Sequence, residues 1–340
     1  MRVLITGSEG YLGTVMAEVM AEAGHEVTGL DSGLFIGATL GPEPVRPPLI
    51  RRDLRDVTAA DLAGFDAVAH LGALSNDPLG SLAPQVTYDI NHAASTRLAQ
   101  LSRDAGVRRF LYASTCSVYG ASGTDEALDE SAPLAPVTPY AESKVRVEDD
   151  LHALADADFE PVSLRNATAF GFSPRLRADI VLNDLVASAV LDGEIVVKSD
   201  GTPWRPLVHA RDIAAAFVAC LEAPREAVFD QAFNVGMDSE NRQVADIAAV
   251  VAEAVPGCQV RVTGEFGGDP RSYRVDFAKI TKQLPAFTPQ WSTLDGAREL
   301  AAAYREHGLT RDMLRGRFTR LAWLQSLQEQ GRLTQDLRWR

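Results

Sequence analysis

Short apolar runs alternate with longer stretches of helical periodicity through the first half of the chain. The runs are Arg2–Thr6, Glu26–Leu30, Ala67–Leu71, Arg109–Ser114 and Pro161–Arg165. Their length and β-branched residues are typical of buried parallel strands. Between them, Gly10–Ala23 and Asn91–Ala105 carry apolar residues at helical spacing. The alternation predicts an α/β fold, a doubly wound parallel sheet with helices on both faces, which binds ligands at the carboxyl ends of its strands.

The second half of the chain is less regular, because prolines separate shorter elements after Arg165. We predict helices at Ile180–Leu191 and Val244–Val255 from their apolar spacing. A further helix at Asp212–Leu221 is expected to return to the sheet.

These patterns predict two parts. Residues 1–170 form the sheet domain, with residues 205–240 returning to it, whereas residues 171–204 and 241–340 form a smaller α/β lobe and a C-terminal tail. The charged tail, residues 311–340, carries one apolar stripe that indicates packing against a core, formed by Phe318, Leu321 and Leu324.

Composition limits the compartment and the partners. The chain has 340 residues, 46% of them hydrophobic, a formal charge of −13 and a pI near 5.0. A core of this size is incompatible with disorder, and the acidic balance makes nucleic acid a poor partner. The three cysteines, Cys116, Cys220 and Cys258, are too few and too widely spaced for a disulfide framework or a metal site. Without a signal peptide or a membrane-length apolar run, we expect a cytoplasmic protein that does not enter the membrane.

A glycine pattern follows the first predicted strand directly. Gly7, Gly10 and Gly13 lie between Arg2–Thr6 and the following helix. In this context glycines permit a tight turn, close approach of the backbone to a pyrophosphate, and close packing of helix on strand. The loop therefore predicts a dinucleotide site.

An acidic residue ends the second predicted strand. Asp31 in this position suits the two ribose hydroxyls of NAD and repels the 2′-phosphate of NADP, so NAD is the expected cofactor. The alternative is that Asp31 only caps the loop that follows. Asp53, after the run of residues 49–52, is a second candidate for the adenine end.

A tyrosine and a lysine share one face of a predicted helix. Thr138 and Pro139 suit its start, and Tyr140 and Lys144 follow at positions i and i+4. A catalytic phenol must ionise near neutrality although its ordinary pKa is about 10, which requires about 4 kcal/mol. An ammonium at about 5 Å, with an effective dielectric of about 20, contributes roughly 3 kcal/mol. The pair thus predicts oxidation of a hydroxyl by a tyrosine base; the alternative is a surface helix with a packing tyrosine.

Thr115 follows the strand predicted at Arg109–Ser114. Its hydroxyl is placed to bind the reacting oxygen and to orient Tyr140, although ordinary turn chemistry would also explain it.

Together these residues resemble the extended short-chain dehydrogenase/reductase family, in its nucleotide-sugar epimerase and dehydratase branch. The resemblance covers nearly the whole chain and implies a Rossmann domain, NAD, a nucleotide-sugar substrate and a substrate-binding second lobe. It makes Tyr140 the base, lets Lys144 also hold the nicotinamide ribose, and assigns the sugar hydroxyl to Thr115. The implied cofactor contacts are Gly7, Gly10, Tyr11, Leu12, Gly13, Asp31, Asp53, Leu54, Leu71, Gly72, Ala73, Asn91, Tyr140 and Lys144.

The resemblance also implies a substrate site and a homodimer. Arg205, in the segment Asp200–Arg205, matches the family arginine that grips the nucleotide diphosphate. The dimer would pack the helix at Asn91–Ala105 and the helix after Tyr140 against their symmetry copies. The implied substrate contacts are Ser75, Ser117, Asn166, Thr168, Arg205 and Arg271, with no metal.

The sequence departs from the family pattern at three places, one of which is Gly72 in the position of a common alanine. Thr168 stands where the family has asparagine, and Asn166 lies two positions earlier. Phe266 stands where the family has an arginine, so Arg271 or Arg274 is expected to substitute.

The residues after Thr115 bear on the reaction. Sugar 4,6-dehydratases resemble one another in carrying acids there, decarboxylases tend to have glutamate at the position of Ser117, and cysteine-using epimerase/reductases place their cysteine at Ser117 rather than Cys116. This favours a 4-epimerase acting through a transient 4-keto sugar. A one-way NAD(P)-dependent 4-ketoreductase or dehydrogenase would use the same residues. A non-catalytic NAD-binding sensor or scaffold remains a third alternative, although such proteins often lack the tyrosine and lysine pair.

Overall fold

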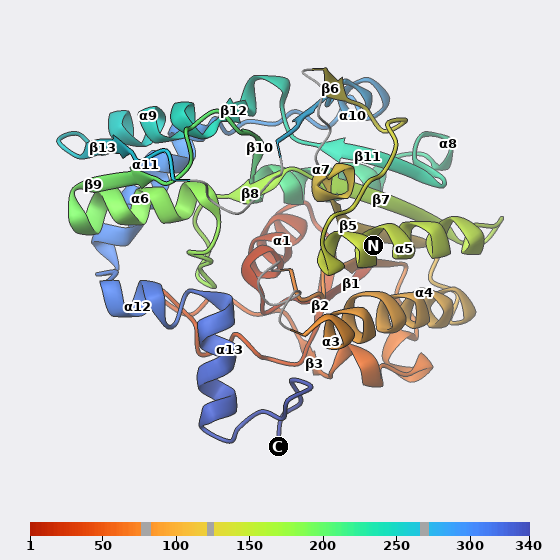
Figure 1. Cartoon of the computed structure of the whole chain (residues 1–340). Coiled ribbons are helices and arrows are strands. Elements are labelled where there is room, and N and C mark those ends of the chain that lie inside the picture. Colours follow the sequence, from red (N-terminus) through yellow and green to blue (C-terminus); the bar gives the residue numbers. More distant parts are fainter. Residues whose placement is uncertain (76–82, 121–125, 266–271) are drawn as a thin grey trace.

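The computed structural model describes all residues except 76–82, 121–125 and 266–271. A seven-stranded parallel sheet forms its centre, in the order β11-β7-β5-β4-β1-β2-β3 (Figure 1). The strands are β1 (Arg2–Thr6), β2 (Glu26–Asp31), β3 (Leu49–Arg51), β4 (Ala67–His70), β5 (Arg109–Thr115), β7 (Glu160–Asn166) and β11 (Gln231–Val235). Each strand predicted from the sequence is present, and the predicted fold class is confirmed. The strand order reverses between β1 and β4, which is where such sheets open a crevice for a ligand.

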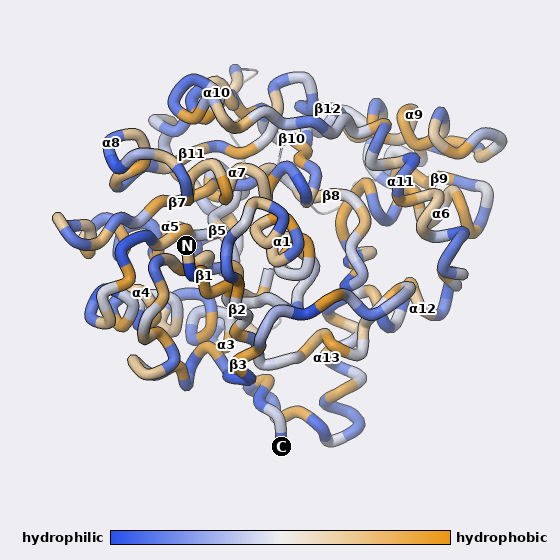
Figure 2. Tube along the Cα trace, turned by 180° about the vertical axis from the view of Figure 1, so that it is seen from behind, coloured by the Kyte–Doolittle hydropathy of each residue, from blue (hydrophilic) through white to orange (hydrophobic). Residues whose placement is uncertain are grey.

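Helices cover both faces of this sheet because successive strand residues point to opposite sides. Val3 and Ile5 of β1 pack in a core with α1 (Tyr11–Glu22) and α7 (Ala210–Glu222). Leu4 packs on the other side with α4 (Ala94–Asp104) and α5 (Pro139–Leu154). Seen from behind, α1 and α7 lie side by side over the sheet (Figure 2).

A second core lies beyond the sheet. It is built by α6 (Val181–Asp192), α9 (Val244–Ala254), α11 (Thr293–Glu306) and β9 (Glu194–Val197). The exposed strand β13 (Gln259–Val262) pairs in parallel with β9. The other elements are β8 (Thr168–Phe170), β10 (Trp204–His209) and β12 (Asn241–Gln243) in a three-stranded sheet, the pair β6 (Ala127–Leu128) and β14 (Arg274–Val275), and the helices α3 (Pro84–Tyr88), α8 (Arg225–Val228), α10 (Ala278–Gln283), α12 (Arg311–Arg315) and α13 (Arg320–Glu329).

We propose the division into a sheet domain and a second lobe as the sequence predicted it, except that one segment after residue 240 is moved to the sheet domain. Phe277 and Ile280, which the sequence analysis assigned to the lobe, are buried in the core of the large sheet together with Phe233 of β11. We therefore propose that residues 273–287 belong to the sheet domain.

The C-terminal tail packs against two different cores. Phe318 is buried in the core of the second lobe, whereas Leu324 is buried in a small separate cluster and Leu321 packs against that cluster. The expected stripe is thus divided, because α13 begins after Phe318 and its Trp323 contacts the loop after β2.

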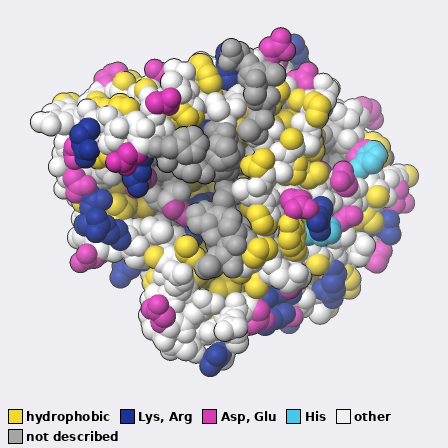
Figure 3. Space-filling view, in the orientation of Figure 1, with side chains coloured by type: hydrophobic (Ala, Val, Ile, Leu, Met, Phe, Trp, Pro, Cys, Tyr) yellow, Lys and Arg dark blue, Asp and Glu magenta, His cyan; other side chains and the backbone are white. Residues whose placement is uncertain are grey.

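Two surface properties bear on partners. Acidic and basic side chains are interspersed over the face shown in Figure 3. No helix in the described ranges is long and apolar enough to cross a membrane.

Candidate active site

A cavity of about 960 Å³ opens at the carboxyl ends of the central strands. It collects nearly all the residues that the sequence analysis selected. Arg271 lies outside the described residues, and Asn91 does not line the cavity. The predicted residues that line it are Gly7, Gly10, Tyr11, Leu12, Gly13, Asp31, Asp53, Leu54, Leu71, Gly72, Ala73, Ser75, Thr115, Ser117, Tyr140, Lys144, Asn166, Thr168 and Arg205.

The glycine loop needs its glycines for steric reasons. Gly7 has φ +73°, and a Cβ added to Gly13 would lie 2.0 Å from the carbonyl oxygen of Gly7. Gly10 is the N-cap of α1 and brings no side-chain cap, so the first N–H groups of the helix are left for a ligand. The loop therefore fits the pyrophosphate of a dinucleotide.

Asp31 lies at the end of β2, beside this loop. Its carboxylate accepts hydrogen bonds from the N–H of Glu9 at 3.0 Å and of Gly33 at 2.6 Å. Burial raises the pKa of Asp31. The hydrogen bond from Gly33 shows that Asp31 does cap the loop after β2, which was the alternative interpretation. Asp31 also lines the cavity.

Two predicted cofactor residues are held by structural partners. Asp53 accepts hydrogen bonds from the backbone N–H and the guanidinium of Arg55, at 2.7–2.9 Å. The amide of Asn91 accepts from the N–H of Leu74 at 2.7 Å and donates to its carbonyl at 3.0 Å. Asn91 thus shapes the wall after β4 and does not itself face the cavity.

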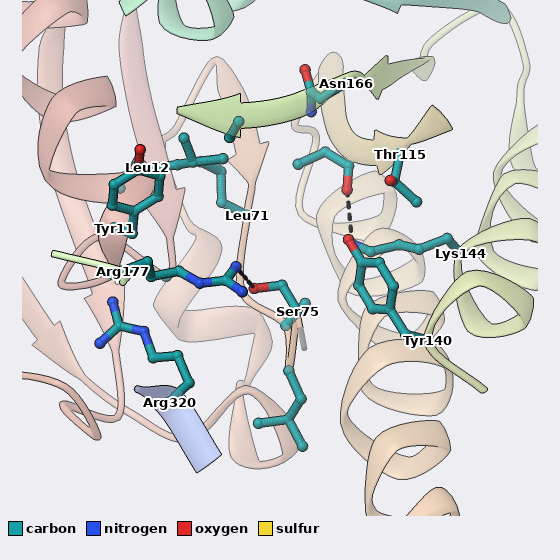
Figure 4. Close-up of a pocket in the computed structure, with 18 of the residues that line it drawn as sticks. Tyr11, Leu12, Leu71, Ser75, Thr115, Tyr140, Lys144, Asn166, Arg177 and Arg320 are labelled. Atoms are coloured by element: carbon teal, nitrogen blue, oxygen red, sulfur yellow. Dashed lines mark hydrogen bonds between the residues drawn. The ribbon is translucent and has the colours of Figure 1, made fainter. Parts of the chain in front are cut away.

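Tyr140 and Lys144 lie on the first turns of α5. The Oγ1 of Thr138 accepts a hydrogen bond from the N–H of Ala141 at 3.2 Å and caps this helix. The Nζ of Lys144 lies 5.7 Å from the centroid of the Tyr140 ring and donates to the carbonyl of Ala113 at 2.7 Å. Figure 4 shows Tyr140 reaching into the pocket with Lys144 beside its hydroxyl end. Burial lowers the pKa of Lys144 to about 7, against the opposing effect of Glu148.

Of the three residues Thr115, Cys116 and Ser117 at the end of β5, only Thr115 and Ser117 line the cavity. The Oγ1 of Thr115 accepts a hydrogen bond from the N–H of Ser117 at 3.1 Å, and both residues line the cavity. Cys116 is buried outside the cavity lining, and its thiol donates to the carbonyl of Arg165 at 3.1 Å. Burial raises the pKa of this thiol. The segment therefore presents hydroxyl groups to the cavity and no acid.

Comparison with known proteins agrees with this geometry. A family model described as the NAD dependent epimerase/dehydratase family matches residues 3–236. The chain belongs to this family. The resemblance stated from the sequence is confirmed, and so is NAD as the cofactor. As members of this family are enzymes, the prediction of an enzyme is confirmed at that level.

Three relatives span nearly the whole chain. The UDP-glucose 4-epimerase of Corynebacterium glutamicum is 27% identical, over 89% of this chain and 95% of its own length. The structure of the Thermus thermophilus UDP-glucose 4-epimerase in complex with NAD is 26% identical, with a TM-score of 0.75, covering 90% of this chain and 99% of that one. A hexosamine 5,6-dehydratase of tunicamycin biosynthesis is 25% identical, with a TM-score of 0.79 and coverages of 90% and 98%. Since epimerases and a dehydratase both match, the reaction has to be argued from the site.

Among the cavity residues that the sequence did not indicate, four come from segments far from the recognised motifs: Arg177, Asp179, Arg320 and Leu337. Arg177 donates to the Oγ of Ser75 at 3.1 Å and to Asp179 at 3.0 Å, and all three line the cavity. Arg320 and Leu337 enter from the C-terminal segment. No local motif marks these residues, because packing between distant segments brings them to the site.

The family's use of NAD makes Asp31 testable. We expect Asp31→Asn to weaken NAD binding by roughly tenfold and to reduce the preference over NADP, because the carboxylate both accepts from ribose hydroxyls and repels a phosphate. Calorimetric titration with each dinucleotide measures this. Glu26→Gln, at the exposed far end of β2, is the matched control. An unchanged preference in Asp31→Asn would assign Asp31 to the loop alone.

Proposed function

We propose that this protein is an NAD-dependent nucleotide-sugar epimerase that inverts C4 through a transient 4-keto sugar, with Tyr140 as the base. The observation that carries the proposal is the position of Tyr140 and Lys144 in the same cavity as the glycine loop. Curated UDP-glucose 4-epimerases among the relatives support it.

The chain's own groups can supply the proton transfer. Tyr140 accepts the proton of the C4 hydroxyl, and the ammonium of Lys144 stabilises the phenolate. Thr115 holds the same sugar oxygen, since its Oγ1 already accepts from Ser117 and its own O–H remains a donor. NAD, when bound, supplies the acceptor and donor of hydride at C4.

The remaining predicted contacts are proposed to hold the substrate. Arg205 of β10 lines the cavity and is our anchor for the nucleotide diphosphate. Asn166 is 7% exposed, and its Oδ1 has no hydrogen-bond partner among the described residues, which suits a substrate donor. Ser75, Ser117 and Thr168 are proposed as further contacts. Two copies are proposed to pair through α4 and α5.

The carboxylates of the cavity do not favour elimination of water. Protonating a departing C6 oxygen requires a neutral acid. In the described part of the lining the acids are Asp31, Asp53 and Asp179, and Asp179 is paired with Arg177 at 3.0 Å. Burial alone would raise the pKa of Asp179, but the charge and hydrogen bond of Arg177 have the larger combined effect, so the pKa lies below its ordinary value. Asp179 is therefore charged at neutral pH and unsuited to be that acid.

The reaction can be tested by its products. UDP-, dTDP- and GDP-sugars are incubated with the enzyme and catalytic NAD in deuterated water, and mass and stereochemistry are determined. We expect C4 stereoisomers of unchanged mass and no accumulation of reduced cofactor. A one-way 4-ketoreductase or dehydrogenase would instead convert the added NAD to NADH, with one 4-keto sugar formed for each NADH, and loss of water with deuterium at C5 would indicate a dehydratase.

A further inference from the structure

The C-terminal segment, residues 319–340, is fastened over the end of the cavity next to β2. The indole N–H of Trp323 donates to the carbonyl of Leu34 at 2.8 Å, and that of Trp339 donates to the carbonyl of Ser32 at 2.7 Å. Arg338 pairs with Asp56 at 2.6 Å. The contacts attach the segment to the loops that follow β2 and β3, where Asp31 and Leu54 line the cavity.

Leu337 reaches the cavity from a costly backbone conformation. Its φ is +60°, a left-handed conformation that is unfavourable for a non-glycine residue, yet it is 4% exposed and lines the cavity with Leu54. A side chain kept at such a position points to a function for it, and here it forms an apolar wall.

Arg320 of α13 is a buried cation with an open hydrogen-bonding position. It is 4% exposed, and its Nη2 donates to the carbonyl of Arg175 at 2.9 Å. Its Nη1 has no hydrogen-bond partner within the described ranges. Burial and the neighbouring Arg177 lower the pKa of Arg320 to about 9. A buried guanidinium with an unused donor is costly unless an anion joins it.

The position of Arg320 in the pocket limits which anion could join it. Figure 4 shows it beside Arg177 and Tyr11, at the end of the pocket away from Tyr140. Tyr11 begins α1, whose first N–H groups have no side-chain cap and could bind an anion. An anion between Arg320 and this helix end would be held from two sides.

We propose that residues 319–340 form the outer wall of the NAD site and that Arg320 binds the pyrophosphate of NAD, so that the cofactor is released slowly. The inference requires only that NAD binds, and it does not depend on which reaction follows.

The test uses the full chain without substrate. We expect Arg320→Gln to weaken NAD binding roughly tenfold to a hundredfold, the range for a lost charge-assisted hydrogen bond, and to accelerate NAD dissociation. Calorimetry and a displacement assay measure the two quantities. Arg317→Gln, exposed three residues earlier, should leave both unchanged. The Tm of the NAD-free variant should change little, because relief from burying the charge offsets the lost hydrogen bond to the carbonyl of Arg175 and the lost contact with the Phe35 ring.

Two results would overturn the proposal. Unchanged NAD affinity with a lower Tm would give Arg320 a structural role. Unchanged NAD affinity with weaker binding of UDP to the NAD-loaded protein would assign Arg320 to the substrate's diphosphate. If Arg320→Gln does not fold, Leu337→Gly provides the second test, because glycine adopts φ +60° freely and only the side chain is lost. We expect NAD to dissociate several-fold faster from Leu337→Gly than from the wild type. An unchanged dissociation rate would contradict the proposal that this segment forms the outer wall of the NAD site.

Discussion

Tyr140→Phe should lower kcat by at least about a hundredfold while the protein folds and binds NAD as before. The change removes one oxygen, and general-base loss has this scale. The ring remains to pack in the cavity wall beside Lys144. Steady-state kinetics with the best nucleotide sugar, together with NAD titration, separates the chemical step from binding.

A second tyrosine provides the control for that experiment. The hydroxyl of Tyr88 donates to Glu142 at 2.6 Å, and Tyr88 is not among the cavity residues. Tyr88→Phe should therefore keep nearly full activity. A Tyr140→Phe enzyme with the wild-type rate would remove Tyr140 as the base and leave Thr115 or a bound water to take the proton.

The parts of this site that sequence could predict are those encoded locally. The loop from Gly7 to Gly13 joins β1 directly to α1, and a Cβ at Gly13 has no room, so spacing alone identifies it. Tyr140 and Lys144 are one helical turn apart on a helix whose start is marked by Thr138. In both places short-range geometry determines what the side chains can reach.

The parts that sequence could not predict depend on distant partners. Asp53 has the right position for the adenine end, but Arg55 engages its carboxylate. Asn91 matches the family pattern, yet its amide is used by the backbone of Leu74. Arg320 reaches the cavity only because the segment around α13 packs against the loop after β2.

Lys144→Met should lower kcat by about a hundredfold or more and at the same time raise the Tm of the NAD-free protein at pH 7. The loss of activity follows from removing the charge that stabilises the Tyr140 phenolate. NAD binding should weaken too, if Lys144 also holds the nicotinamide ribose.

The gain in stability follows from the pKa of Lys144. In the unfolded chain the lysine has its ordinary pKa of 10.5, whereas burial lowers the pKa in the folded protein to about 7. Between these values the unfolded chain binds a proton that the folded protein does not, so stability decreases as the pH falls from 10.5 to 7. Methionine removes this penalty. The loss of the hydrogen bond to Ala113 offsets about 1 kcal/mol of the gain, so we expect a rise in Tm on the order of 3 °C.

The pH dependence distinguishes this effect from better packing by methionine. The difference in Tm between Lys144→Met and wild type should be largest near pH 7 and should shrink as the pH rises toward 10, where the wild-type lysine is neutral in the folded protein and increasingly neutral in the unfolded one. Lys198→Met, at an exposed position, should show neither the rise in Tm nor the loss of activity. A gain that does not change with pH would mean that methionine stabilises by packing alone. A fall in Tm at pH 7 would mean that the ammonium is stabilised in the folded protein, and the site would then hold Lys144 charged before any substrate or cofactor arrives.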